Sequence, residues 1–160
     1  MTISKSSAQL ALSATCTPTR TNVSNSVAVG AALATKSFTD ADIVYSFSVT
    51  ATGVTDVATL TIATGDVAQE TGTPTITGAG VDFEGNDIGT AATLYAILVE
   101  QLVDGDMFID GTYTEFRSMA KTGDKGLWLF TDGRALSSDT VILDLNAVGV
   151  KASVTVIAKT

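Results

Sequence analysis

The chain has 160 residues but no histidine, one cysteine and only two prolines. Without histidine, one chain cannot build a cysteine–histidine zinc site, a histidine-containing catalytic triad or a histidine general base. A single cysteine excludes an internal disulfide framework. The sequence also contains no phosphate-binding glycine loop with its lysine and no serine nucleophile elbow. We therefore expect a non-enzymatic protein without catalytic residues, metal ligands or cofactors.

Long hydrophobic runs are missing as well. The longest strongly apolar run, Leu94–Val99, is far shorter than the about 20 residues that span a bilayer. Residues 1–16 lack the unbroken apolar stretch of a secretory signal, because Gln9 and Ser13 interrupt it. We interpret Cys16 as a small buried thiol and not as a site of lipid attachment. These features predict a soluble protein made in a cytosol, with no membrane partner.

Charge of one sign is absent from half of the chain. Residues 1–36 contain three bases and no acid, residues 37–116 contain 13 acids and no Lys or Arg, and residues 117–160 contain six bases and four acids. The net charge of −8 argues against nucleic-acid binding, which requires clustered bases. Acids in a run without bases must be solvated, hydrogen-bonded, bound to cations or opposite bases elsewhere. The simplest interpretation is a solvated acidic surface, and the sharper one is contact between basic ends and the acidic middle of neighbouring subunits.

Hydrophobic residues that are present recur with a period of two, as in half-buried strands. Two such runs, Asp42–Thr50 and Val57–Ala63, flank a loop that contains Gly53, and together they predict a β-hairpin. Pro74 is expected at a sheet edge or in a loop. The core-facing residues of the two runs are predicted to be Ile43, Tyr45, Phe47, Val49, Ala58, Leu60 and Ile62.

Residues 91–103 fit both a helix and a buried strand, and we favour the strand because the surrounding pattern is β. Further short strands are expected over 107–113, 115–119, 126–131, 141–145 and 150–158, at hairpin spacing and with a turn at Asp132–Gly133. The fold class is therefore all-β, a single β-sandwich or barrel-like domain of short antiparallel strands. The expected division is an extended N-terminal arm over 1–36 and a sandwich domain over 37–160.

Several acidic clusters invite a functional interpretation. Asp104, Asp106 and Asp110 resemble a calcium loop, but the EF-hand pattern fails at its fifth and sixth positions, so a polar turn is the better interpretation. A calcium site that uses Asp82, Glu84 or Asp87 remains open but has no supporting spacing. A glycosidase would need two carboxylates facing a sugar cleft with aromatic platforms, whereas Phe47, Phe83, Trp128 and Phe130 are expected in the core.

The C-terminal half also carries a family likeness. It runs through GVDFEGNDIGTAATLYAILVE, GLWLFTDGRALSSDTVILDL and the Val-rich closing segment ASVTVIAKT. From Val81 to Thr160 the chain resembles small virion structural proteins of tailed bacteriophages, most of all the β-sandwich decoration or cement proteins of capsids. The resemblance implies a homo-oligomer, such as a trimer, docked on the major capsid protein or another virion protein, without enzymatic activity. Tail-tube and head-fibre proteins share much of this texture.

In this interpretation the N-terminal arm contacts a neighbouring subunit. The expected interface residues are Lys5, Arg20 and Lys36 of the arm, and Arg117 and Lys121 of a small basic cluster that also includes Lys125. Two other classes stay open. A carbohydrate-binding or adhesin module would need exposed aromatics, for which Tyr113 and Trp128 are the candidates, and a hydrolase would need a pair of carboxylates.

Overall fold

The computed structural model describes residues 8–14, 32–38, 41, 43–82, 85, 87–114 and 117–160. This part of the chain consists of β-strands and turns, with no helix. The strands are β1 (Ala8–Ala14), β2 (Ala32–Phe38), β3 (Ile43–Thr50), β4 (Asp56–Thr61), β5 (Asp66–Thr71), β6 (Thr75–Thr77), β7 (Thr93–Val103), β8 (Met107–Gly111), β9 (Arg117–Met119), β10 (Lys125–Ala135), β11 (Thr140–Leu145) and β12 (Lys151–Lys159).

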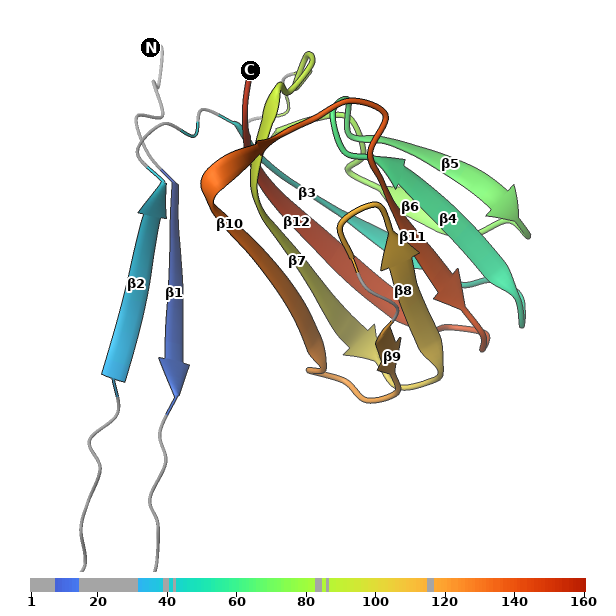
Figure 1. Cartoon of the computed structure of the whole chain (residues 1–160). Helices are drawn as coiled ribbons and strands as arrows, with labels where there is room; N and C mark the ends of the chain where they lie inside the picture. Colours follow the sequence, from blue (N-terminus) through green and yellow to red (C-terminus); the bar gives the residue numbers. More distant parts are fainter. Residues whose placement is uncertain are drawn as a thin grey trace, which may run out of the picture.

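Two five-stranded antiparallel sheets pack face to face and form a β-sandwich (Figure 1). Sheet I has the strand order β10-β7-β12-β3-β6, and sheet II has the order β5-β4-β11-β8-β9. Strands β1 and β2 pair with each other in a separate antiparallel two-stranded sheet. The prediction of an all-β sandwich is confirmed. The division at residue 36 remains a prediction, although β2 runs across that position.

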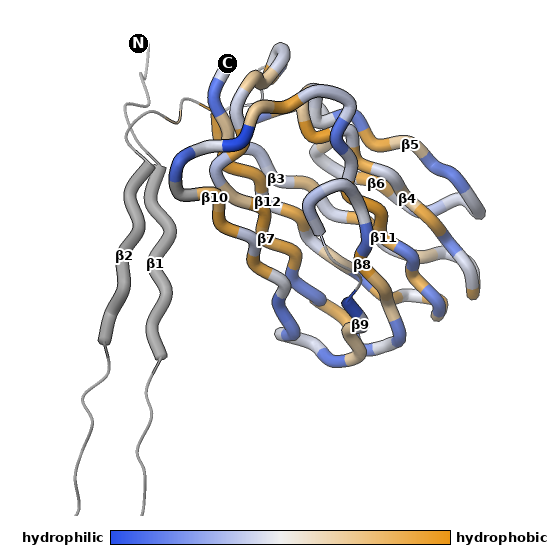
Figure 2. The backbone as a smooth tube through the Cα atoms, viewed as in Figure 1, coloured by the Kyte–Doolittle hydropathy of each residue, from blue (hydrophilic) through white to orange (hydrophobic). Residues whose placement is uncertain are grey.

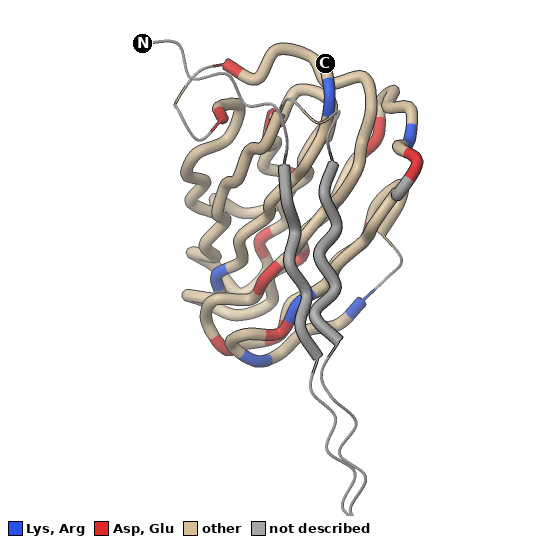
Figure 3. The backbone as a smooth tube through the Cα atoms, turned by 90° about the vertical axis from the view of Figure 1, so that its left-hand side faces the viewer, with Lys and Arg blue, Asp and Glu red and all other residues tan. Residues whose placement is uncertain are grey.

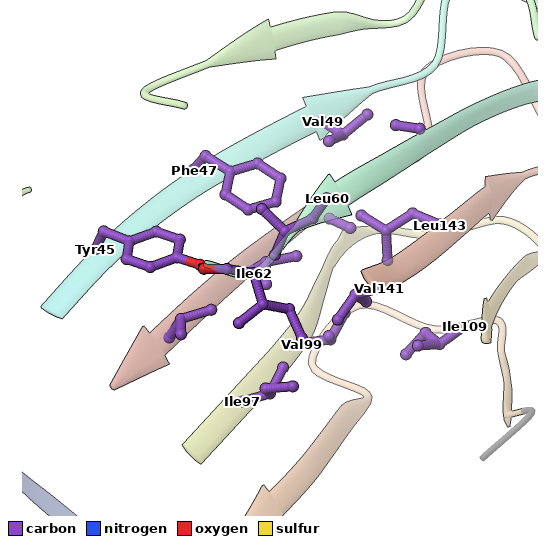
Figure 4. Close-up of a cluster of buried hydrophobic side chains, with 14 of the residues drawn as sticks. Tyr45, Phe47, Val49, Leu60, Ile62, Ile97, Val99, Ile109, Val141 and Leu143 are labelled. Atoms are coloured by element: carbon purple, nitrogen blue, oxygen red, sulfur yellow. The ribbon is translucent and has the colours of Figure 1, made fainter. Parts of the chain in front are cut away.

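Alternation along each strand builds the core. In β3, β4, β11 and β12 every second residue is buried, and Figure 2 shows the matching alternation of hydrophobic and hydrophilic residues. The predicted core residues of 43–49 and 58–62 are all less than 7% exposed. Figure 4 shows side chains of both sheets meeting between the layers, with the Tyr45 hydroxyl next to Ile62. That hydroxyl donates a 2.6 Å hydrogen bond to the Ile62 carbonyl oxygen, so one buried bond joins sheet I to sheet II.

The predicted hairpin of β3 and β4 is wrong. Strand β3 pairs with β12 and β6 in sheet I, whereas β4 pairs with β5 and β11 in sheet II. The turn over 51–55 therefore crosses from one sheet to the other. The inward faces of both strands are apolar, and packing these faces against each other buries both, which a flat hairpin on its own cannot do.

Five connections of the described chain cross between the sheets at one end of the sandwich: 51–55, 72–74, 104–106, 120–124 and 146–150. We call this the crossing end. The opposite end holds the two tight connections of β4–β5 and β8–β9, the crossing turn at 136–139 and the long segment at 78–92. The expectation of hairpin spacing for all the C-terminal strands is thus wrong, since β8–β9 is the hairpin there and the other neighbours in sequence change sheets.

Two further local predictions have clear outcomes. Residues 93–103 form strand β7, so the preference for a strand is confirmed. The predicted turn at Asp132–Gly133 is wrong, because β10 continues to Ala135 through a bulge between Leu129 and Arg134. Gly133 has a φ of 74°, which glycine adopts without strain and which suits a bulge as well as a turn. Pro74 precedes the edge strand β6, as expected.

Candidate interaction surfaces

Carboxylates hold the crossing end together. Asp56 is 2% exposed. One of its oxygens accepts hydrogen bonds from the backbone N–H of Thr52 at 2.7 Å and of Gly53 at 3.0 Å. The backbone of Thr73 also donates to Asp56, so this carboxylate joins the turns at 51–55 and 72–74. Hydrogen bonds from Gly53 and then Thr52 lower the pKa of Asp56, which keeps it ionised despite burial.

Two more carboxylates, Asp104 and Asp124, accept hydrogen bonds that fix the turns at 104–106 and 120–124. Asp104 accepts hydrogen bonds from the backbone N–H and the hydroxyl of Thr122, both at 2.7 Å, and forms a 3.2 Å ion pair with Lys121. The hydrogen bonds from Thr122 and then Lys121 lower the pKa of Asp104 to about 2. Asp124 accepts hydrogen bonds from the N–H groups of Ala120 and Lys121, and these lower its pKa as well.

A buried amide, Gln101, binds the turn at 104–106 from the interior of the sandwich. It is 0% exposed, and its side-chain nitrogen donates hydrogen bonds to the carbonyl oxygens of Val103 at 2.9 Å and Gly105 at 2.5 Å. Sequence reasoning missed Gln101 because a lone amide in an apolar strand resembles an exposed position. Its neighbours in β7, which are buried at alternate positions, were the available signal.

Such hydrogen bonds give several acids of residues 37–116, the segment without Lys or Arg, a partner within the chain. Asp87 and Asp110 likewise accept hydrogen bonds from the backbone N–H of Gly89 and Gly111. Figure 3 shows most of the strand length free of charge, with acidic residues both at turns and within strands. Within the described part of the chain, no group of three or more metal-ligating side chains is present. Glu84 of the open calcium hypothesis lies outside the described residues, as does Phe83, which is expected in the core.

The predicted interface residues are scattered. Lys5 and Arg20 lie outside the described residues, and Lys36 lies in β2, opposite Leu10. Lys121 is paired with Asp104. The guanidinium of Arg117 lies 5.5 Å from the centre of the Trp128 ring and donates a hydrogen bond to the backbone oxygen of Lys125. The basic cluster therefore contacts acidic and aromatic residues of the same chain, and its proposed role between subunits remains a prediction.

Lys125 also pairs with an acid of the same chain. Its ammonium group forms a 3.1 Å ion pair with Glu100 across strands β10 and β7. Two bases of the C-terminal segment thus meet acids of the middle segment within one chain.

One aromatic candidate, Tyr113, lies at the opposite end. A shallow depression of about 410 Å³ is lined by residues that include Tyr113, Phe130, Arg134 and Thr114. Tyr113 makes an edge contact with Phe130 at 5.5 Å, and the Arg134 guanidinium lies 5.2 Å from its ring centre. Phe130 and Trp128 are partly buried against the core. The rings of Tyr113 and Trp128 each have an arginine over them, which leaves less of each ring for stacking on a sugar.

The two outer faces of the sandwich differ in charge. Residues that alternate with the buried ones place Lys125, Lys151 and Lys159 on the outside of sheet I, with Glu100 paired to Lys125. The same alternation places Asp66, Asp110 and Asp144 on the outside of sheet II. Strands β5, β4, β11 and β8 contain no Lys or Arg. We call these surfaces the lysine face and the aspartate face.

Sequence reasoning missed both faces, although the period-two pattern that predicts the core also predicts the outward positions. What it lacked was the assignment of strands to sheets, which decides whether outward residues of two strands lie together.

No family model, curated protein or solved structure matches the chain. The described residues contain no helix with the length and apolar character needed to cross a membrane.

Proposed function

We propose that the protein is a non-enzymatic structural component of a virus particle, which decorates or cements a bacteriophage capsid through contacts with copies of itself and with the major capsid protein. The alternative position in the particle is the tail tube or a head fibre. The observation that carries the self-association is the opposite charge of the lysine and aspartate faces, each of which also presents half-buried apolar side chains. Such faces complement each other between copies.

The resemblance of residues 81–160 to virion structural proteins supports the capsid part of the proposal. The sandwich supports it in a second way. Asp56, Asp104 and Asp124 accept hydrogen bonds from turn residues and hold these turns in place, and the connections at the crossing end are three to five residues long. Short turns and a continuous two-layer core suit a passive and durable part.

Two measurements test the proposal. Light scattering coupled to size exclusion, at low and high salt, is expected to give an oligomer that loosens with salt, because opposite charges on exposed surfaces are screened. A monomer at all concentrations contradicts self-association. Sedimentation of the protein with shells of the virus that carries its gene is expected to show binding, and a protein that stays in the supernatant contradicts decoration. Binding to a glycan array instead would favour the carbohydrate-binding alternative.

A further inference from the structure

The aspartate face has an apolar trough at its centre. Val57, Phe108 and Ile142 line a depression of about 170 Å³ together with Asp110 and Asp144. The three apolar side chains are half-buried, so part of each lies open on the outside of sheet II. Asp144 lies in β11, the central strand of this sheet, directly opposite Val57 on one side and Phe108 on the other. The trough is therefore a patch of apolar side chains that flanks a carboxylate.

Asp144 has no balancing group on this face. Its Oδ1 atom is buried and has no hydrogen-bond partner among the described residues. The four strands β4, β5, β8 and β11 supply no Lys or Arg. A carboxylate oxygen in such surroundings is costly unless a cation or a donor approaches the group. The trough therefore suits an ammonium group that comes from another molecule.

The lysine face carries an unpaired base on its own central strand. Lys151 begins β12, the middle strand of sheet I, and lies directly opposite Thr50 and Val103. Lys125 of the same face is paired with Glu100, whereas no acid in the described part of the chain forms an ion pair with Lys151. Lys151 thus supplies a cation of the kind that the trough lacks.

The lysine face also presents apolar side chains. Leu98 and Leu127 lie directly opposite each other in β7 and β10, on the same side of the sheet as the Glu100–Lys125 pair. Both leucines are half-buried, and Leu129, the next outward residue of β10, is 42% exposed. The two outer faces therefore both combine apolar side chains with charge, and their charges have opposite signs, as complementary surfaces do.

Lys151 and Asp144 lie at the same end of the sandwich, on opposite outer sides. The turn at 146–150 joins β11 to β12 at the crossing end (Figure 1), and Asp144 is the last outward residue before this turn, whereas Lys151 is the first after it. The two side chains point away from each other, so they do not meet within one chain. A second copy stacked in the same orientation brings its Lys151 to the level of Asp144, whereas Lys159 lies at the far end of β12.

We propose that sheet I of one copy stacks on sheet II of a second copy in the same orientation, with Lys151 of the one opposite Asp144 in the trough of the other. This inference rests on the self-association in the proposed function and names its residues and the orientation of the copies. Stacked sheets lie about 10 Å apart, a gap that an extended lysine and an aspartate can bridge.

The apolar side chains support the same orientation. The turn at 104–106 makes β7 and β8 neighbours across the two layers of one copy. Stacking in the same orientation therefore places β7 of one copy, with Leu98, over β8 of the other, with Phe108. The contact joins two different surfaces, so its repetition gives a ring or an open stack.

Charge reversal in the full-length protein tests this contact. Asp144→Lys and Lys151→Glu are each expected to weaken self-association about tenfold or more, because like charges then meet between copies. The dependence of mass on concentration in light scattering measures the effect. A double variant that combines Asp144→Lys with Lys151→Glu should regain the association of the original protein, since every contact then holds a reversed pair.

A second double variant is the matched control. It combines Asp106→Lys with Lys151→Glu, so it also keeps the net charge at −8, but Asp106 lies exposed in the turn at 104–106, outside both faces. This variant is expected to associate as weakly as Lys151→Glu alone. Asp106→Lys alone is expected to associate like the original protein.

Each outcome decides between the proposals. An original protein that stays monomeric at all concentrations overturns both the self-association and the stacked contact. An oligomer that neither reversal weakens overturns the stacked contact and leaves the proposed function standing. If both reversals weaken the oligomer but the first double variant associates no better than the control, Lys151 and Asp144 do not meet between copies. If Asp144→Lys keeps the original mass but no longer binds viral shells, a capsid protein occupies the trough and the stacked contact is wrong.

Melting curves check that each variant folds. Asp110→Lys, at an exposed position of the trough, takes the place of Asp144→Lys if that variant does not fold. It is expected to weaken self-association as well, and a folded Asp110→Lys protein that associates like the original overturns the stacked contact.

Discussion

Different contacts hold the two sheets together at the two ends of the sandwich. At the crossing end, connections of three to five residues change sheets, and carboxylates such as Asp56 and Asp104 accept their backbone N–H groups. At the opposite end, the buried hydroxyl of Tyr45 joins the sheets, and aromatic side chains around Tyr113 surround a depression. Turn carboxylates dominate the crossing end, whereas the opposite end combines the Tyr45 hydrogen bond and ring contacts with a single buried turn carboxylate, Asp139, which accepts a 2.7 Å hydrogen bond from the backbone N–H of Ser137.

The difference explains how a run of 80 residues without a base can fold. A carboxylate that accepts two or three backbone N–H groups is stabilised by their dipoles and needs no cationic partner. Acids are therefore consistent with tight turns at the crossing end. The pKa of Tyr45 shifts in the other direction from those of Asp56 and Asp104. Burial raises the pKa of Tyr45, so its hydroxyl stays neutral and can donate a hydrogen bond.

The largest expected loss of stability comes from a steric clash at the crossing end. In Gly105→Ala, the new Cβ would collide with a methyl group of Val150, at a backbone φ of 139° that non-glycine residues rarely adopt. We expect a loss of about 3 kcal/mol or more in the free energy of unfolding, measured by urea denaturation. Gly123→Ala in the adjoining turn is the matched control, because its φ is also positive but its Cβ would meet no atom within 4 Å. A similar loss in both variants would show that backbone conformation alone matters.

The next effect breaks the opposite end. Tyr45→Phe removes the 2.6 Å bond between the sheets and leaves the Ile62 carbonyl oxygen without that donor in the core. The expected cost is about 1–3 kcal/mol, as for other buried groups that lose a partner. Urea denaturation measures it, with Tyr113→Phe as a control, since the hydroxyl of Tyr113 makes a longer and exposed bond to Ala135. An equal loss in both variants would contradict the importance of burial.

Much of the inner architecture was predictable from the sequence. The alternation in residues 43–50 and 57–62 identified the inward residues, because burial on one face of a strand imposes a period of two. The partner of each strand was not predictable from it. A loop of five residues with Gly53 suits a hairpin and a crossing turn equally, and the pairing of β3 with β12 and of β4 with β11, which no local pattern specifies, decides between them.

The candidate surfaces were less predictable for the same reason. The sequence showed that the acids and bases are separated, but several explanations remained open for the acids. Asp104 and Lys121 are 17 residues apart and meet only because two crossing turns lie side by side. Likewise, Asp110 and Asp144 come together through the pairing of β8 with β11, which no local pattern specifies.

Acid pH is expected to remove the stability that the turn carboxylates Asp56 and Asp104 contribute at the crossing end. The folded-state pKa values of Asp56 and Asp104 are lowered, in the case of Asp104 to about 2. Each therefore contributes stability that is present above the unfolded pKa of about 4 and is lost as the pH falls through the folded value. Asp56→Asn and Asp104→Asn should lower the melting temperature at pH 7 and flatten its dependence on pH below about 4. Asp66→Asn is the control, and an equally flat profile for it would contradict a special role for the turn carboxylates.

The smallest expected effect concerns the ion pair of Lys125 and Glu100. Lys125→Gln removes the 3.1 Å contact, but the lysine side chain is 53% exposed and that of Glu100 is 30% exposed. Exposed pairs of this kind contribute about 0.2–1 kcal/mol, and salt screens them. We expect a loss of less than about 0.5 kcal/mol in low salt that disappears in high salt, measured by urea denaturation at both salt concentrations.

The value of this last variant lies in its contrast with the turn carboxylates. If stability depended mainly on cations placed opposite the acidic segment, Lys125→Gln would cost more than Asp56→Asn. The geometry requires the reverse order, because Asp56 is buried and bound by backbone donors of two turns, whereas Glu100 has an exposed partner. A Lys125→Gln loss that exceeds that of Asp56→Asn at pH 7 would therefore show that ion pairing, and not hydrogen bonding at turns, stabilises the acidic half of the chain.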